Sequence, residues 1–485
     1  MASRKAFGGE SAEDGEKNTE PNQEQTDRHK SFRSAADFYR AKPTLDRRIH
    51  ILGVGNVGSF IAHALRGIPD PPPVTLIFSR WDKLNEWNES QKRLTLVTDG
   101  DAEIREGYDA EIAIPRIRYH HQEVGLNASS AVPLEDGSRE EILSGESTEP
   151  IRSLIICSKA ASVLQGISSV KHRLDKDSVI LFLQNGMGIV EEVSREIFPD
   201  PATRPYYMLG INSHGVNNSS GGKFTTTHAG FGTILLGILP HERDRNPNSP
   251  YEPDVKFSPG GKVGATPTNQ PSPADEINSE YPPPTSAKFK WTPNQRYLLR
   301  TLLRAPVLGA AAYSPPDLLQ IQLEKLVANC IINPLTVLLD ARNGAILYNY
   351  ALTRTMRLLL SEISLVIRSL PELQYIPNVS SRFDPGRLET LVVSIANKTK
   401  DNVSSMLADA RAGRQTEIEY INGWIVKRGE ELGIVCALNY MVVQMVKGKV
   451  AMVARELGDG VPFVEGGDVE VKEGVAQTNE EEEKR

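Results

Sequence analysis

The chain of 485 residues has few cysteines and no arrangement of histidines typical of a metal site. Its three cysteines, Cys157, Cys330 and Cys436, lie far apart in apolar segments, so they suggest neither a disulfide framework nor a zinc pattern. A reducing compartment fits this usage best. The nine histidines lack the H-E-x-x-H spacing or a similar one, and we therefore expect them to serve packing and expect no metal ion.

Long apolar runs and an excess of positive charge are also missing. The most apolar stretch, "GIVCALNYMVVQMVKGKVAMVA", contains Lys447 and Lys449, which predicts a buried closing helix and not a membrane span. The formal charge of -7 argues against nucleic acid as the main partner. Because the N-terminus mixes acidic and basic residues without an apolar core, it is unlike a secretory signal or a transit peptide. We expect a cytoplasmic protein, with mitochondria as the alternative.

Composition divides the chain into folded and unfolded segments. Both ends are polar and charged, and a region rich in Pro, Ser, Gly and Asn interrupts the chain at about 241–290. A shorter polar excursion covers Leu134 to Pro150. The predicted organisation is a disordered tail (1–44), a nucleotide-binding domain with the disordered insertion (45–314), a helical domain (315–462) and a disordered acidic tail (463–485).

Between these segments, strand-like and helix-like patterns alternate. The runs "RRIHILGVG", "VTLIFSR", "SLIICSK" and "SVILFLQNGMG" read as strands, and "SFIAHALRGI" reads as a helix. Strands separated by helices indicate parallel βαβ units with both sheet faces covered. From about Pro315 helical periods follow one another. We therefore predict an α/β protein with an N-terminal Rossmann-type parallel sheet and an all-helical C-terminal domain.

The motif "GVGNVG" follows the first predicted strand and opens a predicted helix. Glycine at Gly53, Gly55 and Gly58 lets the turn tighten and the backbone approach a pyrophosphate, which the amides at the helix N-terminus would bind. Asn56 and Val57 lie inside the same turn. This context predicts a dinucleotide site. The alternative is a glycine-rich turn with a structural role only.

The end of the second predicted strand bears on which dinucleotide binds. An NAD site usually has Asp or Glu there for the ribose hydroxyl, whereas "LIFSRWDK" has Ser79 and Arg80. A guanidinium suits a 2′-phosphate, so NADP is favoured. In the alternative, Arg80 is a solvated surface residue and Asp82 binds the ribose.

Four sequence blocks resemble the ketopantoate reductase (2-dehydropantoate 2-reductase) family over most of residues 47–460. In chain order they are "CSKA", "LQNGMG", "EKLVANCIINPLTVLLDARNG" and "SSMLADARAGRQTEIEYINGWIVKRGEELGI", which is also the family's order. The resemblance implies an NADP-dependent oxidoreductase that converts 2-dehydropantoate to pantoate, the step that feeds pantothenate and coenzyme A synthesis. The substrate would be a small 2-keto acid.

The resemblance also implies the site residues. Lys325 matches the family's catalytic acid. The positions matching substrate ligands are Asn329, Asn343, Ser405 and Glu417. Lys159 and Asn185 match positions that contact NADPH. Reduction of a carbonyl leaves charge on oxygen, and Lys325 can supply a proton or a cation there. Asn333 shares the helix face of Lys325 and Asn329 but precedes a proline, so we expect it to be structural.

Two alternatives for the function, and the oligomeric state, remain open at this point. The substrate could be another branched 2-keto acid. The chain could instead be a non-catalytic binding or regulatory protein on the same fold, although a binding protein has no chemical need for the full set of Lys325, Asn329, Ser405 and Glu417. The apolar final helices could bury a homodimer surface.

Overall fold

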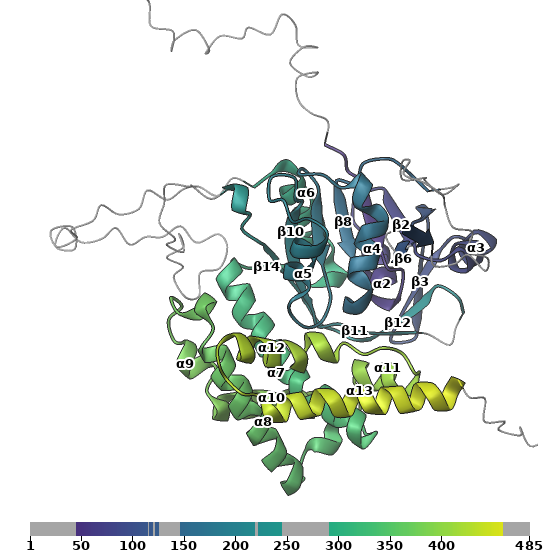
Figure 1. The fold of residues 1–485 in the computed structure, drawn as a ribbon. Coiled ribbons are helices and arrows are strands. Elements are labelled where there is room, and N and C mark those ends of the chain that lie inside the picture. Colours follow the sequence, from purple (N-terminus) through teal and green to yellow (C-terminus); the bar gives the residue numbers. More distant parts are fainter. Residues whose placement is uncertain are drawn as a thin grey trace, which may run out of the picture. The chain divides into compact units, whose positions relative to one another are not determined.

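The computed structural model describes residues 45–114, 116–119, 122–125, 146–218, 222–244 and 291–458 (Figure 1). The predicted tails, the insertion from residue 245 onward and most of the excursion from Leu134 lie outside the described residues. We call residues 46–314 the sheet half and residues 315–458 the helical half.

An eight-stranded sheet forms the centre of the sheet half. Its order is β14-β13-β10-β9-β8-β1-β2-β5, and the strands from β10 to β5 all pair in parallel. The bounds are β1 (Ile49–Leu52), β2 (Val74–Phe78), β5 (Tyr108–Ile112), β8 (Ser153–Ile156), β9 (Val179–Phe182), β10 (Tyr206–Asn212), β13 (Ile234–Ile238) and β14 (Ala311–Ala312). The four strands and the one helix predicted above all form here, and the predicted fold class is confirmed.

Helices cover both faces of this sheet, which explains why its central strands are mostly apolar. One face packs with α2 (Asn56–Arg66) and α6 (Pro293–Leu303) in a core that includes Ile51 of β1. The other packs with α4 (Val163–Val170) and α5 (Ile189–Glu196) in a core that includes Leu52. Because successive side chains point to opposite faces, a strand buried on both sides needs no polar alternation.

Smaller strands lie beside the main sheet. A second sheet has the order β11-β12-β3-β4, and β6 pairs with β7. The bounds are β3 (Leu94–Thr98), β4 (Asp101–Arg105), β6 (Arg116–Tyr119), β7 (Gln122–Gly125), β11 (Gly215–Asn218) and β12 (Thr225–Gly230), with α3 at Trp81–Glu89.

The first residues of the predicted disordered insertion, His241 to Asp244, belong to the described structure. There Arg243 donates to the carbonyl of Arg204 and lies over the ring of Tyr206.

The helical half packs around one long central helix, α7 (Pro315–Leu339) (Figure 1). Ser314 caps its start by accepting a bond from the amide of Asp317. The other bounds are α8 (Tyr350–Arg368), α9 (Val379–Arg382), α10 (Pro385–Lys398), α11 (Ser405–Arg411), α12 (Asn422–Glu431) and α13 (Ala437–Gly458). These helices share a hydrophobic core of their own, which α7 supplies through Leu323, Val327 and further residues.

A proline inside α7 is compensated by a side chain from α12. Pro334 has no N–H, so the carbonyl of Cys330 one turn earlier lacks its helical donor. The Nδ2 of Asn422 donates to that carbonyl at 2.9 Å and to Asn439 Oδ1 at 3.0 Å. Asn422 is fully buried. The helix that carries Lys325 is thereby continuous despite the proline.

Candidate active site

The glycine motif forms the turn between β1 and α2, where the strand order reverses between β1 and β8. Gly53 has a φ of 98°, and a Cβ there would lie 2.5 Å from the amide nitrogen of Ser158. A Cβ on Gly58 would lie 2.1 Å from the carbonyl oxygen of Gly53, so both positions exclude a side chain. Gly55 precedes α2 in extended conformation and has open space beside it. The arrangement suits an anion at the helix N-terminus.

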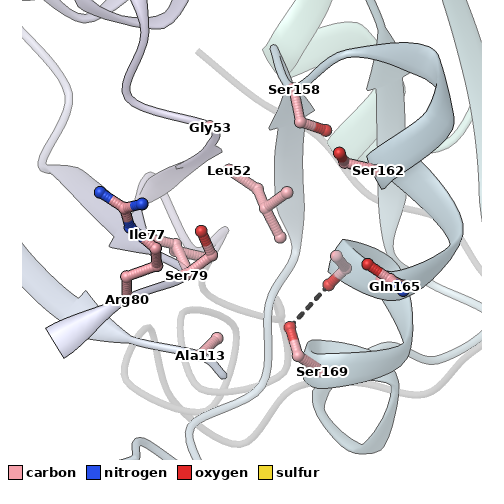
Figure 2. A pocket seen from close by; sticks show the side chains of 11 residues that line it. Leu52, Gly53, Ile77, Ser79, Arg80, Ala113, Ser158, Ser162, Gln165 and Ser169 are labelled. Atoms are coloured by element: carbon pink, nitrogen blue, oxygen red, sulfur yellow. Dashed lines mark hydrogen bonds between the residues drawn. The ribbon is translucent and has the colours of Figure 1, made fainter. Parts of the chain in front are cut away.

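A cavity of about 280 Å³ continues from this turn, between the carboxyl ends of four strands (β1, β2, β5 and β8) and α4 (Figure 2). Apolar side chains and hydroxyl or amide groups both face it. Its lining consists of Leu52, Gly53, Ile77, Ser79, Arg80, Ala113, Ser158, Ser162, Gln165, Gly166 and Ser169. A crevice outside the carboxyl ends of the strands at a topological switch point is where such sheets bind nucleotides.

Arg80 lines this cavity, immediately before α3. Its guanidinium donates to Asp82 at 2.8 Å, and the two side chains are 54% and 59% exposed. Asp82 is thus an ion-pair partner of Arg80 and is absent from the cavity lining. Of the remaining motif residues, Asn56 donates to the carbonyl of Val216 at 3.5 Å, and Val57 packs partly against the core.

Lys325 reaches from α7 to the sheet half. Its Nζ donates to Asn185 Oδ1 at 2.8 Å and to the carbonyl oxygen of Asn212 at 2.6 Å. These acceptors follow β9 and end β10, at the carboxyl edge of the sheet. Burial lowers the pKa of Lys325 to about 8, and the negative charge of Glu417 opposes that change.

Glu417 completes this group from the opposite side of Asn185. It is only 5% exposed, and its two carboxylate oxygens accept from Asn185 Nδ2 at 3.2 Å and from the amide of Ala160 at 3.1 Å. Asn185 therefore bridges Lys325 and Glu417. Three predicted residues from distant parts of the sequence meet at one place.

Close backbone contact holds the loop of Asn185 against the helical half. Gly186 has a φ of 86°, and a Cβ there would lie 2.3 Å from the carbonyl oxygen of Tyr420. The next amide, that of Met187, donates to the same carbonyl at 2.8 Å. Glycine is therefore needed at position 186 both to end the strand and to let this loop pack closely against the helical half.

Lys159, which follows β8, forms an ion pair that the sequence did not predict. Its Nζ lies 2.7 Å from Asp409 Oδ2 of α11, and Arg414 donates to the other oxygen at 3.0 Å. Asp409 is 4% exposed. The signal was available in "SMLADAR", where Asp409 falls one helical turn after Ser405, but the resemblance pointed to Ser405 and Glu417 only.

The other predicted substrate residues lie along α7 and at the start of α11. Asn329 is half-buried one turn after Lys325, on the same helix face. Ser405 is exposed as the first residue of α11. The preceding Ser404 is buried and has a structural role, because it caps α11 through the amide of Leu407 at 3.1 Å.

Asn343 lies apart from the Lys325 group. It follows the end of α7, whose last residue is about 20 Å along the helix axis from Lys325 at 1.5 Å per residue. Its Nδ2 donates to Thr399 Oγ1 at 3.0 Å, and its amide donates to the carbonyl of Asn402. The structure therefore brings together Lys325, Asn185 and Glu417 but leaves Asn343 at the far end of α7.

The described part of the chain contains neither a metal-binding cluster nor a helix that could span a membrane. Among those residues no cluster of three or more His, Cys, Asp or Glu side chains could bind a metal ion. Within the same ranges no helix is both long enough and apolar enough to span a membrane. His214 and His228 instead contact each other at 3.0 Å and pack against Phe60.

Comparison with known proteins agrees with this geometry. Residues 49–241 match the family described as ketopantoate reductase PanE/ApbA, and residues 317–450 match its C-terminal part. A Schizosaccharomyces pombe protein named probable 2-dehydropantoate 2-reductase is 25% identical over 410 residues, 84% of this chain and 98% of its own. A Beauveria bassiana protein named ketoisovalerate reductase is 25% identical over 430 residues, 80% of this chain and 79% of its own.

The solved structures agree in fold. The crystal structure of 2-dehydropantoate 2-reductase from Geobacter metallireducens has a TM-score of 0.54 at 18% identity, and the match covers 83% of this chain and 99% of that one. A sequence identity this low supports a similar fold only. The two family matches span both halves and include the glycine turn, Lys325 and Glu417. The chain belongs to the ketopantoate reductase family of oxidoreductases.

Proposed function

We propose that the protein reduces 2-dehydropantoate to pantoate with NADPH, the step that feeds pantothenate synthesis. The observation that carries this proposal is the contact of Lys325 with Asn185, which links the helical half to the carboxyl edge of the sheet. An ammonium at the edge where a dinucleotide binds is suited to a carbonyl that receives a hydride. A purely binding protein has no need of that arrangement.

The reaction requires a hydride and a proton. NADPH, when bound, supplies the hydride to the carbonyl carbon. Lys325 gives a proton from Nζ to the carbonyl oxygen, so the keto acid becomes a 2-hydroxy acid and the lysine becomes neutral. The lowered pKa of Lys325, about 8, makes this transfer easier than from an ordinary lysine. In the bound state the carbonyl oxygen would replace the present acceptors, Asn185 Oδ1 and the carbonyl of Asn212.

Glu417 and Asn185 would orient this chemistry. Glu417 keeps a negative charge near Lys325 and so favours the protonated lysine. Asn185 can bond both residues at once, which fixes their separation. Asn329 and Ser405 would bind the substrate without adding charge, and Asn343 would join them only if its end of α7 contributes to the site.

NADPH is the proposed cofactor because of Arg80. The helix N-terminus at Gly55, Asn56 and Val57 suits the pyrophosphate of either dinucleotide, whereas a guanidinium at the cavity suits a 2′-phosphate. The present ion pair with Asp82 is largely exposed and therefore weak, so a phosphate can replace it.

The keto acid itself has a second candidate. The Beauveria bassiana relative named ketoisovalerate reductase is as similar in identity as the Schizosaccharomyces pombe relative. The substrates in the two names, 2-dehydropantoate and ketoisovalerate, are both branched 2-keto acids. The test is a comparison of kcat/KM for 2-dehydropantoate, 2-ketoisovalerate and pyruvate, measured by NADPH oxidation with purified full-length protein. Higher kcat/KM for 2-ketoisovalerate would replace the first candidate, and absence of oxidation with all three would reject the proposed reaction.

A further inference from the structure

Two buried histidines lie at the turn that follows β10. His214 and His228 are 9% and 3% exposed, and Nδ1 of His214 lies 3.0 Å from Nε2 of His228. His214 comes two residues after Asn212, whose carbonyl oxygen accepts from Lys325 Nζ at 2.6 Å. Apolar rings would fill the same space without burying ring nitrogens, so packing alone does not explain the pair.

The partners of His214 determine which of its ring nitrogens is protonated. Nε2 lies 2.9 Å from the carbonyl oxygen of Leu308, which can only accept, so Nε2 carries the proton. Nδ1 accepts from the backbone amide of Gly232 at 3.1 Å, and His228 must then donate to the same Nδ1 from its Nε2. Burial, and to a smaller extent His214, lowers the pKa of His228. Both rings are therefore neutral at pH 7.

His214 joins three segments of the sheet half. They are the turn after β10, the loop between β12 and β13 at Gly232, and the 3-10 helix η4 (Pro306–Leu308). The neighbouring Ser213 strengthens the link to the loop, because its amide donates to the carbonyl of Thr233 at 2.9 Å. A Cβ on Gly232 would overlap the carbonyl carbon of Ser213, so the loop and the turn pack backbone against backbone.

The anchored turn carries one of the two groups that hold Lys325. The amide of His214 donates to Asn212 Oδ1 at 3.0 Å, so the side chain of Asn212 is tied to the residue whose ring is fixed. The carbonyl of Asn212 accepts from Lys325, whose other acceptor, Asn185 Oδ1, comes from the loop after β9. A shift of the turn after β10 would therefore weaken one of these two bonds and leave the other in place.

The bond to the Asn212 carbonyl also favours a protonated Lys325, because a hydrogen bond to the charged form of a group stabilises that form. Burial lowers the pKa of Lys325 to about 8, and among the described residues only the charge of Glu417 opposes that change. The carbonyl of Asn212 thus helps to keep the ammonium charged until the keto acid arrives.

We propose that His214 and His228, as a neutral pair, hold the carbonyl of Asn212 in place and thereby position Lys325 for proton donation. Both histidines are positioning residues, since each acts only through Asn212 and Lys325. This inference deepens the proposed function and rests on it. The pair acts before the keto acid binds, because the bond to Asn212 belongs to the substrate-free site.

The experiment is the pH profile of kcat/KM for the preferred 2-keto acid at saturating NADPH, from pH 6 to 10. This quantity reports the pKa of the proton donor before the keto acid binds. His214→Phe keeps a ring of similar size and removes all three ring hydrogen bonds. Weakening of one charge-assisted bond should move the alkaline decline downward from about pH 8 by roughly one unit. The loss of kcat/KM is then about tenfold at pH 9 and no more than about twofold at pH 7.

His63→Phe is the matched control. His63 is also a buried histidine of the sheet half, 1% exposed, and its Nε2 lies 3.0 Å from the carbonyl oxygen of Glu103. Its replacement should leave the alkaline decline at about pH 8. A shift as large as that of His214→Phe would mean that loss of any buried imidazole perturbs the site, and it would overturn the inference.

Two conservative variants test the bonds of His214 separately. The amide of Gln in His214→Gln can reach the position of Nε2 and still donate to Leu308, whereas the amide of Asn in His214→Asn can still accept from Gly232. Each should shift the alkaline decline less than His214→Phe does. These two variants carry the same comparison if His214→Phe loses cooperative unfolding in urea.

Double variants test whether the pair acts through Lys325. His228→Phe should shift the decline in the same direction, and its combination with His214→Phe should add little. In the Lys325→Met background, His214→Phe should likewise have little further effect at pH 9. A further loss as large as in the wild-type background, or a loss in His214→Phe that is equal at pH 7 and pH 9, would show a merely structural role.

A measurement without substrate distinguishes failure of this inference from failure of the proposed function. NMR titration of protein labelled with ¹³C at lysine Cε gives the pKa of Lys325, and Lys325→Met identifies its signal. If the wild type reduces none of the keto acids, the proposed function is rejected, and a lower pKa of Lys325 in His214→Phe still supports positioning by the pair. If the wild type reduces them and His214→Phe changes neither this pKa nor the pH profile, only this inference is rejected.

Discussion

Hydride transfer should slow as the pH rises through about 8, the pKa to which burial lowers Lys325. The protonated lysine is the form that donates. With a pKa of about 8, roughly nine-tenths of Lys325 is protonated at pH 7 and roughly one-tenth at pH 9, so the rate should fall about tenfold between them. An unperturbed lysine, with a pKa of 10.5, would give a nearly flat profile in this range.

The assay is single-turnover oxidation of NADPH from pH 6 to 10, which isolates the chemical step from product release. Lys325→Met should lower the rate roughly 10²–10⁴-fold and remove the alkaline decline. Lys447→Met is the matched control, because Lys447 is half exposed on α13 and pairs with Glu419. A wild-type rate that stays constant between pH 7 and 9 would refute the assignment of Lys325 as the proton donor.

The same pKa predicts a stability effect of defined sign. Between about pH 8 and 10.5 the unfolded chain holds the Lys325 proton that the folded chain has lost, so stability rises with pH there. Below that window the folded state carries the cost of a buried charge, on the order of 3 kcal/mol before its hydrogen bonds are counted. Lys325→Met cannot titrate, so in urea the free energy of unfolding of the wild type should rise relative to that of Lys325→Met between pH 8 and 10.5.

Glu417→Gln removes the charge that raises the pKa of Lys325, so the alkaline decline should shift below pH 8 in the same assay. Arg80→Ala should weaken NADPH binding roughly 10–150-fold and leave the NADH dissociation constant nearly unchanged. Equal weakening of both would contradict the assignment of Arg80 to the 2′-phosphate. The double variant with Lys83→Ala tests whether Lys83 partly compensates for the loss of Arg80. Replacing 245–290 with a short flexible linker should keep cooperative unfolding and activity, since that segment has few apolar residues.

Features with a local signal were predictable from the sequence. The turn after β1 needs glycine at Gly53 and Gly58 because neighbouring backbone atoms occupy the space that a side chain would fill. The glycine motif in the sequence therefore predicts this turn directly. The apolar runs correctly predicted the central strands, because strands that are buried on both faces have mostly apolar side chains. The meeting of Lys325 with Asn185 was predictable only through the family resemblance, since the two residues are 140 positions apart.

Features that depend on distant partners were not predictable. The parallel pairing of β12 with β3 joins segments 130 residues apart at Thr225 and Thr95, and neither segment has an unusual composition. The sequence does not show whether Asp409 is solvated or buried, and its partner Lys159 lies 250 positions away in the sequence, after β8. The position of Asn343 depends on where α7 ends and on its bond to Thr399, neither of which its own sequence block reveals.

Asn422 offers a test of how α7 tolerates Pro334. Its Nδ2 supplies the donor that the carbonyl of Cys330 lost to the proline, and it also bonds Asn439 Oδ1. Asn422→Leu keeps the approximate volume and removes the donor, which leaves two buried acceptors without it. At about 1–3 kcal/mol for each such group, the free energy of unfolding should fall by roughly 2–6 kcal/mol.

Restoring the helical donor should recover part of that loss. Pro334→Ala returns an N–H four residues after Cys330, so Asn422→Leu should cost less in the Pro334→Ala background than in the wild type. Urea unfolding of the two single variants and the double variant measures this coupling, with the exposed Asn397→Leu as the control for an asparagine replaced elsewhere in the helical half. Equal costs in both backgrounds would mean that the amide of Asn422 does not substitute for the missing backbone bond. A smaller cost would show that a side chain from α12 maintains the helix from which Lys325 reaches the sheet.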